Sequence, residues 1–517
     1  MVKPLRKIAD PFVVASPAGL RIRTRLHPTR AEAEALKDIG RFLGGLYRAE
    51  LAGRVAAGRL AGPRRAEWRR ERKRTVTAVT SSRWAGAIIR AVEDQYQLGM
   101  RSAAADVAFL SAAVDAVTRR CAVEPGTVAA GVRGYHTAAE RHQKRRRLTQ
   151  LQHRLRCART VLDQAHPSIT VGGNHLWRNR NHLDRATLTE AEWGELWSAR
   201  RAFFTADGES GKRLGNETIR VDGTGQVTIK VPAALADTHG SRLALTVAVG
   251  FTHRAGQWLD RVMTNKAVRY DITYDVTRAR WYLDASWAAP TEPVPPLATL
   301  QAGRVVGVDL NANHLACTVL DFHGNVLGQP VTIPLDLAGV PATTRDGRLR
   351  FAISSLIELA HRSQCPAVVI ENLNFTDARS SGRETMGRGQ RGKRFRRTVS
   401  GIPTARFRDR LAGMTATAGL HLIAVDPAYT SRWGSQHWTK PVQQQAVIVV
   451  TRHHAAATAI ARRGKHLPIR RRTTGPRNGQ RTVSGFPPPR PPRQQHLPPV
   501  VSSSAPPVID QMTGSSG

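Results

Sequence analysis

The chain has 517 residues, which is long enough for several domains and at least one sizeable core. Lys and Arg number 78 against 39 Asp and Glu, giving a formal net charge of +39. Because the basic excess is spread along the whole sequence, it favours a long polyanion such as nucleic acid as the partner. An anionic membrane surface and a general bias toward Arg are the alternatives that charge alone leaves open.

The N-terminus and the cysteines argue against several classes of protein. MVKPLRKIADPFVV lacks the continuous apolar segment of a signal peptide, and no apolar run approaches the roughly 18 residues of a membrane span. The four cysteines form no CxxC pair. They are Cys121, Cys157, Cys317 and Cys365. We therefore expect a soluble intracellular protein with no membrane partner, no disulfide framework and no Cys-based zinc site.

The first predicted elements are a strand and a helical lobe. Residues 11–30 contain the alternating stretch LRIRTRL, so residues 1–31 are expected to begin a β domain. Residues 32–165 predict helices, because apolar residues recur there every four positions. The clearest series is Ile88, Val92, Tyr96 and Met100.

Two segments of the helical lobe, 63–74 and 141–156, are densely basic. On a helix these side chains lie on several faces, so some can contact phosphates while others meet solvent. Both interpretations stay open. The candidate nucleic-acid-binding residues in these segments are Arg69, Arg70, Arg72, Lys73, Arg145 and Arg146.

Residues 166–290 have a period near two and predict a mainly antiparallel sheet or barrel. A hairpin is expected at 217–231, and further strands at 243–251, 267–276 and 279–287. The strand near residue 20 is expected to join them, leaving the helical lobe as an insertion. Residues 291–302 are rich in Pro and predict a linker.

Three tryptophans of this region, Trp177, Trp193 and Trp197, have basic neighbours in the sequence. Indole rings can stack on nucleobases, although filling a helix or barrel core is the commoner use of Trp. The sequence leaves both uses open.

Residues 303–464 predict a mixed sheet with helices on its faces. Strands are expected at 304–310, 314–321, 325–332, 366–371 and 420–426, with helices around 349–360, 402–419 and 442–463. The order β-β-β-α-β-α-β-α is typical of an RNase H-like domain. Residues 465–517 are rich in Pro, Arg, Gln and Ser, and predict a disordered tail.

Two acids end strands that are expected to be neighbours in this sheet. Asp309 ends the first strand and Glu371 ends the fourth. Their carboxylates could converge on hard divalent cations, and a metal pair about 4 Å apart stabilises both the attacking and leaving oxygens of phosphodiester hydrolysis. The alternative is that each acid caps a helix or pairs with an arginine.

The segment 379–397 follows the Glu371 strand and is rich in Gly and Arg. It predicts a mobile cationic loop at the mouth of the site, which could order on a heteroduplex or on single-stranded DNA. A solvated loop without a specific role is the alternative. The candidate binding residues are Arg391, Lys393, Arg394, Arg396 and Arg397.

Three segments carry a resemblance to a known family. GVDLNANHLACTVLDFHGNVLG, AVVIENLNF and VDPAYTSRWGSQHW resemble the RuvC motifs of TnpB proteins and of miniature type V CRISPR effectors, over residues 300–464. The resemblance implies a multidomain α+β fold, with a helical recognition lobe inserted in a wedge β-barrel before a RuvC nuclease domain. It also implies guide RNA, target double-stranded DNA and an RNA–DNA heteroduplex as partners, and antiviral defence as a role.

The chain departs from the family at two places. A zinc finger usually follows the YTS sequence, whereas residues 430–442 contain no cysteine, so no zinc is expected and Trp433 and Trp438 are predicted to fill that volume. The second departure concerns the third catalytic acid. When Ala456, Ala457, Ile460 and Gly464 are aligned with the family motif, His453 stands at the position of that acid.

The resemblance therefore implies Asp309, Glu371 and His453 as catalytic and metal-binding residues, with Mg²⁺ as the cofactor. A histidine ligand is softer than a carboxylate and shifts the preference toward Mn²⁺. His454, Arg452 and Asp426 are weaker substitutes for the missing acid, and loss of cleavage at a degenerate position is the alternative.

The predicted function is an RNA-guided DNA endonuclease that recognises a short flanking DNA motif, forms an R-loop and cleaves by metal-dependent hydrolysis. Two alternatives stay open: an RNA-guided DNA-binding repressor with weakened or lost cleavage, and a transposase or resolvase that acts without RNA. The sequence does not decide between a CRISPR effector and a transposon-encoded TnpB protein, nor between a monomer and a dimer.

Overall fold

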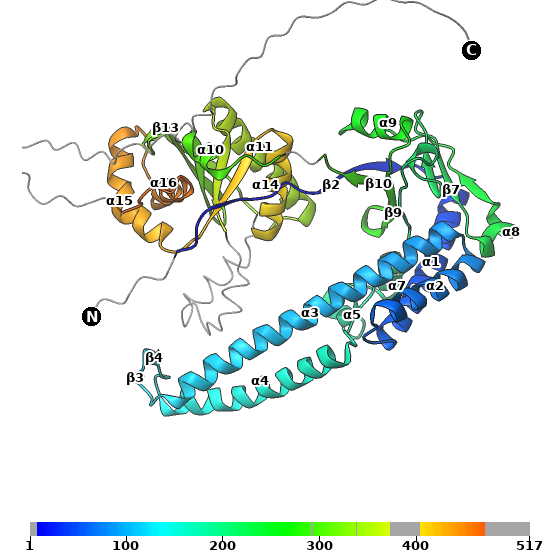
Figure 1. Cartoon of the computed structure of the whole chain (residues 1–517), viewed down its shortest axis with the longest axis horizontal. Helices are drawn as coiled ribbons and strands as arrows, with labels where there is room; N and C mark the ends of the chain where they lie inside the picture. Colours follow the sequence, from blue (N-terminus) through cyan, green and yellow to red (C-terminus); the bar gives the residue numbers. More distant parts are fainter. Residues whose placement is uncertain (1–7, 291–292, 338, 373–403, 471–517) are drawn as a thin grey trace, which may run out of the picture. The chain divides into compact units, whose positions relative to one another are not determined.

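The computed structural model describes residues 8–290, 293–337, 339–372 and 404–470. The chain has an N-terminal part, from residue 19 to residue 290, and a C-terminal part that carries the predicted acids (Figure 1). Among the described residues, no helix combines the length and apolar character needed to cross a membrane.

The N-terminal part contains four long helices. They are α1 (Arg30–Ala56), α2 (Gly62–Val79), α3 (Ser82–Ala122) and α4 (Ala138–Gln164). α1 starts with a capping box, in which Thr29 accepts from the backbone of Glu32 and the Glu32 carboxylate accepts from the backbone of Thr29. α3 and α4 run side by side and are joined through the short hairpin of β3 (Val128–Ala129) and β4 (Val132–Arg133) (Figure 1).

Two antiparallel sheets complete this part. The first has the order β2-β10-β9-β5, and the second the order β6-β7-β8. Their strands are β2 (Gly19–Leu26), β5 (Thr205–Ala206), β6 (Ile219–Val221), β7 (Val227–Lys230), β8 (Arg242–Ala244), β9 (Arg269–Asp275) and β10 (Arg280–Ala288). β2 pairs with β10 along its whole length, so α1 to α4 are inserted between paired strands of one sheet.

Two predictions for this part were wrong. Residues 174–201 form α5 (Asn174–Asn179), α6 (Leu183–Ala186) and α7 (Glu190–Arg201), although the sequence assigned 166–290 as a whole to a sheet or barrel. The missed signal was a second capping box, Thr189 with Glu192. The strand expected at 243–251 ends at Ala244, because the Glu32 carboxylate accepts from both the backbone and the hydroxyl of Thr246 and draws the chain off the sheet.

The C-terminal part is built on a six-stranded mixed sheet with the order β1-β15-β14-β11-β12-β13. β11, β12 and β13 form an antiparallel meander, while β14 and β15 run parallel to β11. This is the mixed sheet that the sequence predicted for an RNase H-like domain. The strands are β1 (Phe12–Val13), β11 (Val305–Leu310), β12 (His314–Leu320), β13 (Val326–Pro334), β14 (Ala367–Glu371) and β15 (His421–Val425).

Helices pack on both faces of this sheet. α11 (Ala342–Arg362) and α14 (Thr404–Thr417) share a core with Val306 and Val308, whereas α16 (Arg452–Gly464) shares a core with Val305 and Val369. α16 lies very close to the sheet, because a Cβ added at Gly307 would be 2.2 Å from the carbonyl oxygen of Ala457. The alanines of α16 are therefore required by its packing.

The predicted long helix at 442–463 is two helices. α15 (Thr430–Gln445) occupies the segment expected to be an irregular insert, and α16 begins only at Arg452. Between them lies the run Val447–Val450, whose β-branched side chains disfavour helix. Trp433 and Trp438 of α15 are buried in a core with residues of α16, as predicted.

The boundaries of the C-terminal part also differ from those predicted. β1 pairs with β15, so residues 12–13 belong to this sheet. The expected linker contains α10 (Leu297–Ala302), whose Leu300 is buried. The fold continues past residue 464, because Ile469 is buried and its carbonyl accepts from the Trp438 indole at 2.7 Å. The rest of the predicted tail lies outside the described residues.

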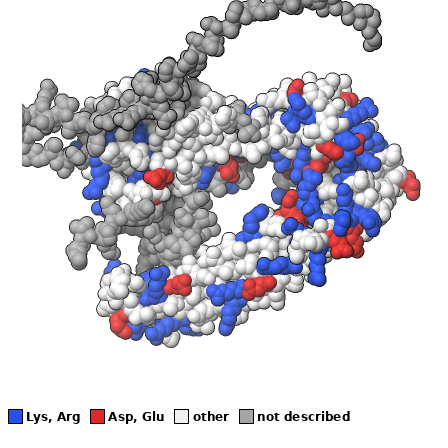
Figure 2. All heavy atoms as spheres, in the orientation of Figure 1, with Lys and Arg blue, Asp and Glu red and all other residues white. Residues whose placement is uncertain are grey.

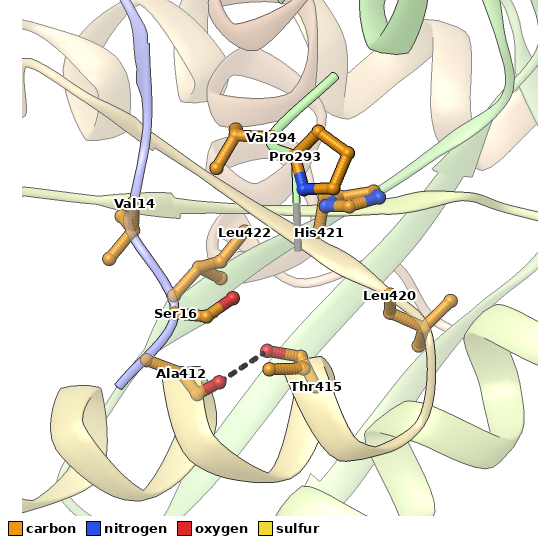
Figure 3. Close-up of a pocket in the computed structure, with 10 residues that line it drawn as sticks. Val14, Ser16, Pro293, Val294, Ala412, Thr415, Leu420, His421 and Leu422 are labelled. Carbon is orange, nitrogen blue, oxygen red and sulfur yellow. Dashed lines mark hydrogen bonds between the residues drawn. The ribbon is translucent and has the colours of Figure 1, made fainter. Parts of the chain in front are cut away.

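A small pocket of about 20 Å³ lies between the segment after β1, the chain at 293–294, α14 and the start of β15 (Figure 3). Its lining is mostly apolar, and the Thr415 hydroxyl donates to the carbonyl of Ala412 within its own helix. This pocket has room for about one water molecule and offers no site for a larger ligand.

Candidate active site

Strand register brings the two predicted acids together. β11 and β14 are parallel with Val308 beside Ile370, so the next residues, Asp309 and Glu371, lie opposite one another at the carboxyl ends of the strands. Side chains alternate between the faces of a sheet. Because Val305 and Val369 face α16, both acids project toward the same helix.

Asp309 is buried, with 6% of its surface exposed, and two side chains hold it in place. The Asn311 amide donates to its Oδ2 at 3.0 Å, and His453 Nδ1 lies 2.9 Å from the same oxygen. A carboxylate only accepts, so His453 donates from Nδ1 in this arrangement. Both contacts use Oδ2, which leaves Oδ1 as the oxygen suited to another ligand.

Burial raises the pKa of Glu371 to about 7. The Thr430 hydroxyl donates to its Oε1 and partly offsets the burial, while the nearby charge of Asp309 raises the pKa further. The charge of Arg463 lowers the pKa of Glu371, and the charge of Asp426 raises it. The combined effect is an acid that is costly to ionise unless a cation approaches it.

Asp426 follows β15 and is the third acid at this edge of the sheet. Its carboxylate oxygens accept hydrogen bonds from backbone N–H groups. Oδ1 accepts from the backbone of Ala428 at 2.8 Å, and Oδ2 from that of Ala9 at 3.1 Å. Arg463 donates to the carbonyls of Asp426 and Ala428 and so stabilises the loop between β15 and α15. These contacts give Asp426 a structural role in forming the turn into α15.

The adjacent histidines at the start of α16 have different surroundings. His454 is buried and completes a capping box: its Nδ1 accepts from the backbone of Thr451, while its Nε2 lies 2.8 Å from the Thr332 hydroxyl. His453 is 28% exposed and contacts Asp309. Of the two histidines, His453 is the one that contacts Asp309, and it is the one that the alignment with the family motif placed at the site.

Three side chains at the site were not predicted from the sequence. Asn311 and Thr430 fix the two acids, and the ring of His314 packs edge-on against that of His453 at 5.1 Å. The signal for Thr430 was present, since it belongs to the YTS sequence used for the resemblance. Asn311 and His314 follow Asp309 within five residues, but their sequence spacing does not indicate which way they point.

The donor set fits a hard divalent cation. Mg²⁺ is usually bound through one or two carboxylates together with water and substrate phosphates, and the convergent carboxylates of Asp309 and Glu371 match that requirement. In the part of the chain that the structure describes, no group of three or more His, Cys, Asp or Glu side chains is arranged as a complete metal cage.

The predicted binding residues of the helical lobe have different uses. Arg69, Arg70 and Lys73 are exposed on α2. Arg72 instead makes a bidentate ion pair with the buried Glu50 of α1, at 2.8 and 2.6 Å. Its guanidinium is therefore used for an intramolecular contact. Arg145 and Arg146 are exposed on α4. The predicted residues Arg391, Lys393, Arg394, Arg396 and Arg397 lie outside the described residues.

Lys and Arg side chains gather over the N-terminal part on the face shown in Figure 2, around α1, α2 and the neighbouring sheet, with few acids among them. Several of the acids that are present are neutralised locally. Asp284 of β10, for example, is buried and accepts from Arg21 and Arg23 at 2.6 to 2.8 Å.

No family model and no curated protein matches the sequence. Among solved structures, the chain is similar to T. thermophilus RuvC in complex with a Holliday junction substrate, with 19% identity and a TM-score of 0.22 over 31% of this chain and 91% of that one. A second Thermus thermophilus RuvC structure matches with 18% identity and a TM-score of 0.18, over 32% of this chain and 92% of that one.

The chain is also similar to Cas12f1 in a complex with single guide RNA and target DNA. The identity is 9% and the TM-score 0.25, over 86% of this chain and 98% of that one. These matches agree with the resemblance predicted from the sequence. At such TM-scores they carry no argument about activity, which rests on the strands and side chains of this chain.

Proposed function

We propose that this protein is an RNA-guided DNA endonuclease, with a metal-dependent RuvC-type site formed by Asp309, Glu371 and His453. The observation that carries the proposal is the pair of carboxylates at neighbouring parallel strand ends, that of the buried Asp309 and that of the partly buried Glu371, facing the histidine at the start of α16. Asp284, the fully buried acid of the N-terminal part, is by contrast neutralised by arginines.

Asp309 and Glu371 would hold Mg²⁺ or Mn²⁺, through Oδ1 of Asp309 and the Glu371 carboxylate. When bound, the cation would supply Lewis-acid activation of a phosphodiester and would relieve the repulsion between the two acids. Thr430 orients Glu371, and Asn311 orients Asp309. A divalent cation thus offsets the burial and repulsion that raise the pKa of Glu371.

His453 can act in either of two ways. With Nδ1 held on Asp309, Nε2 is the acceptor nitrogen of the ring and receives a long hydrogen bond from Arg452 Nε at 3.4 Å. If that bond is released, Nε2 can accept a proton, as a general base does. If a cation takes Asp309 instead, the neutral ring can turn and serve as a ligand itself. Both roles require an uncharged ring at the start of α16, and both make His453 part of the site.

The basic surface supports nucleic-acid partners. A net charge of +39, with exposed cations on α2 and α4, suits contacts along phosphate backbones. Base pairing with a guide RNA would then supply sequence specificity, and the protein would hold the heteroduplex by its backbone and read only a short flanking DNA motif.

The test is cleavage of a plasmid with a randomised flank by protein co-expressed with the RNA of its own locus, in Mg²⁺ and in Mn²⁺. Wild type is compared with Asp309→Ala and His453→Ala. Cutting that requires the RNA and is lost in both variants supports the proposal. Binding of the guided target without cutting would assign the protein as an RNA-guided repressor, and cutting without RNA would assign it as a conventional resolvase or transposase.

A further inference from the structure

Three tryptophans of the segment between α4 and β5 form one stack. Trp197 of α7 lies between Trp193, at 5.4 Å and 18° between ring planes, and Trp177 of α5, at 6.0 Å and 26°. The spacing of Trp193 and Trp197 by four residues on a helix brings their rings together. The sequence had left open whether these rings fill a core or face outward.

The inner end of the stack is structural. The Trp193 indole donates to the carbonyl of Leu176 at 2.9 Å and so ties α7 to α5. Gly172 packs against Trp197 so closely that a Cβ there would lie 2.5 Å from the ring. Trp193 and Trp197 thus form a rigid base whose rings are fixed by their surroundings.

The outer end of the stack is exposed and capped by a guanidinium. Trp177 is 44% exposed. The guanidinium of Arg180 lies over its ring at 3.6 Å, the distance at which a flat group stacks, and is held there by one hydrogen bond to the Trp177 carbonyl. The flat guanidinium of Arg180, supported from beneath by the Trp177 ring, can therefore stack on a planar group with its outer face.

Two arginines lie beside the stack. Arg201 lies over Trp197 at 5.0 Å, and its Nε is buried with no hydrogen-bond partner among the described residues. Arg48 donates to the Arg201 carbonyl at 3.0 Å, and its pKa is lowered by burial and by the charge of Arg201. Two neighbouring guanidiniums of this kind attract a phosphate group.

We propose that Trp177 and Arg180 stack on an unpaired base of a single-stranded nucleic acid, with Arg201 and Arg48 taking an adjacent phosphate. Aromatic rings beside guanidiniums are how proteins bind single strands, because every base has a flat face and every nucleotide a phosphate. The inference shares its nucleic-acid partner with the proposed function but does not depend on cleavage. Guide RNA and displaced DNA strand present the same chemistry.

The test measures binding of full-length protein to a fluorescein-labelled oligonucleotide of about 12 residues by anisotropy, at several salt concentrations. The probes are single-stranded RNA, single-stranded DNA and a fully paired duplex. The variants are Trp177→Leu, Trp177→Phe and Arg180→Ala, with Arg178→Ala as the matched control because Arg178 is exposed on the same helix but lies over no ring. Thermal unfolding checks that each variant is folded.

Trp177→Leu is expected to weaken single-strand binding about 5- to 150-fold while duplex binding stays unchanged. Trp177→Phe keeps a ring and most of the affinity. Trp177→Leu and Arg180→Ala both leave the slope of log affinity against log salt unchanged, because the adjacent phosphate contacts Arg201 and Arg48 and stays bound in both variants. If Trp177→Leu loses affinity for single-stranded RNA alone, the bound strand is RNA. If it loses affinity for single-stranded DNA alone, the bound strand is DNA.

The proposal is overturned if Trp177→Leu binds single strands like wild type, or loses single strands and duplex equally. Wild type that binds none of the probes would overturn the nucleic-acid partnership of the proposed function as well. Cleavage lost in Asp309→Ala but kept in Trp177→Leu, with normal oligonucleotide binding by Trp177→Leu, would leave the proposed function standing and reject only this inference.

Discussion

The two parts of the molecule treat a buried acid in opposite ways. In the N-terminal part, burial alone would raise the pKa of Asp284, but hydrogen bonds from Arg23 and Arg21 outweigh it and hold the pKa below its usual range. In the C-terminal part, the printed donor to Glu371 among the described residues is the Thr430 hydroxyl, and burial raises the pKa of Glu371 to about 7. Asp284 is neutralised by two guanidiniums, whereas Glu371 lies beside a second acid and keeps a raised pKa, so a cation from outside the protein would stabilise its ionised form.

The largest expected effect follows from removing the charge of Asp309. Asp309→Asn keeps the shape and the contact with Asn311 but removes half of the acid pair, so guided cleavage should fall at least about a thousandfold. The measurement is single-turnover cleavage at saturating protein. Asp321→Asn is the matched control, because Asp321 also ends a strand but its carboxylate serves the turn at Asn325. Equal loss in both variants would contradict the special role of Asp309.

The neighbouring histidines should separate activity from stability. His453→Ala removes the contact with Asp309 and should lower cleavage about a hundredfold with little change in unfolding free energy. His454→Ala removes the capping box and the contact with Thr332, so it should cost about 1 to 2 kcal/mol of stability. Urea unfolding and cleavage rates are compared for both. The reverse pattern would place the functional histidine at 454.

Removing the charge of Asp284 should lower the unfolding free energy and change how that free energy depends on pH. Asp284→Asn should lower the unfolding free energy by about 2 kcal/mol, because Arg21 and Arg23 lose their acceptor but are half exposed and can be hydrated. The pKa of Asp284 is lowered in the folded state. Its contribution is therefore present above the usual Asp pKa of about 3.9 and is lost as pH falls below that value.

Urea unfolding at neutral pH and at about pH 3.5 tests this. The difference between wild type and Asp284→Asn should shrink at the lower pH, since Asp284 then begins to protonate in the unfolded state. A difference that stays constant with pH would mean that the ion pairs with Arg21 and Arg23 contribute nothing measurable.

The smallest effect concerns the exposed cations. Lys73→Ala and Arg145→Ala should each lower the slope of log affinity against log salt for nucleic acid by up to about 0.9. Arg350→Ala is the control, since Arg350 already pairs with Asp346 and should not change the slope. Affinity that falls without any change in slope would mean that these side chains do not contact phosphates.

Much of the C-terminal part could be predicted because its signals are local. Buried strands ending in Asp309 and Glu371 fix both the sheet order and the position of the acids. The helix break at 446–451 was missed because Ala446 to Val450 read as apolar helix, although four β-branched residues in a row disfavour it.

Contacts between distant residues could not be predicted. The role of Thr430 depends on β14 and β15 being neighbours, and that of Arg72 depends on a buried Glu50 in another helix. Trp177 illustrates the same limit: its exposure and its place on Trp197 depend on how α5 and α7 pack.

The most direct test of the central claim is Mn²⁺ binding to the protein without nucleic acid, followed by electron paramagnetic resonance. Wild type and Asp321→Asn should bind Mn²⁺ at a site that Mg²⁺ displaces, and this site should be lost in both Asp309→Asn and Glu371→Gln. Mn²⁺ binding that is unchanged in these two variants would contradict a metal centre at the paired strand ends.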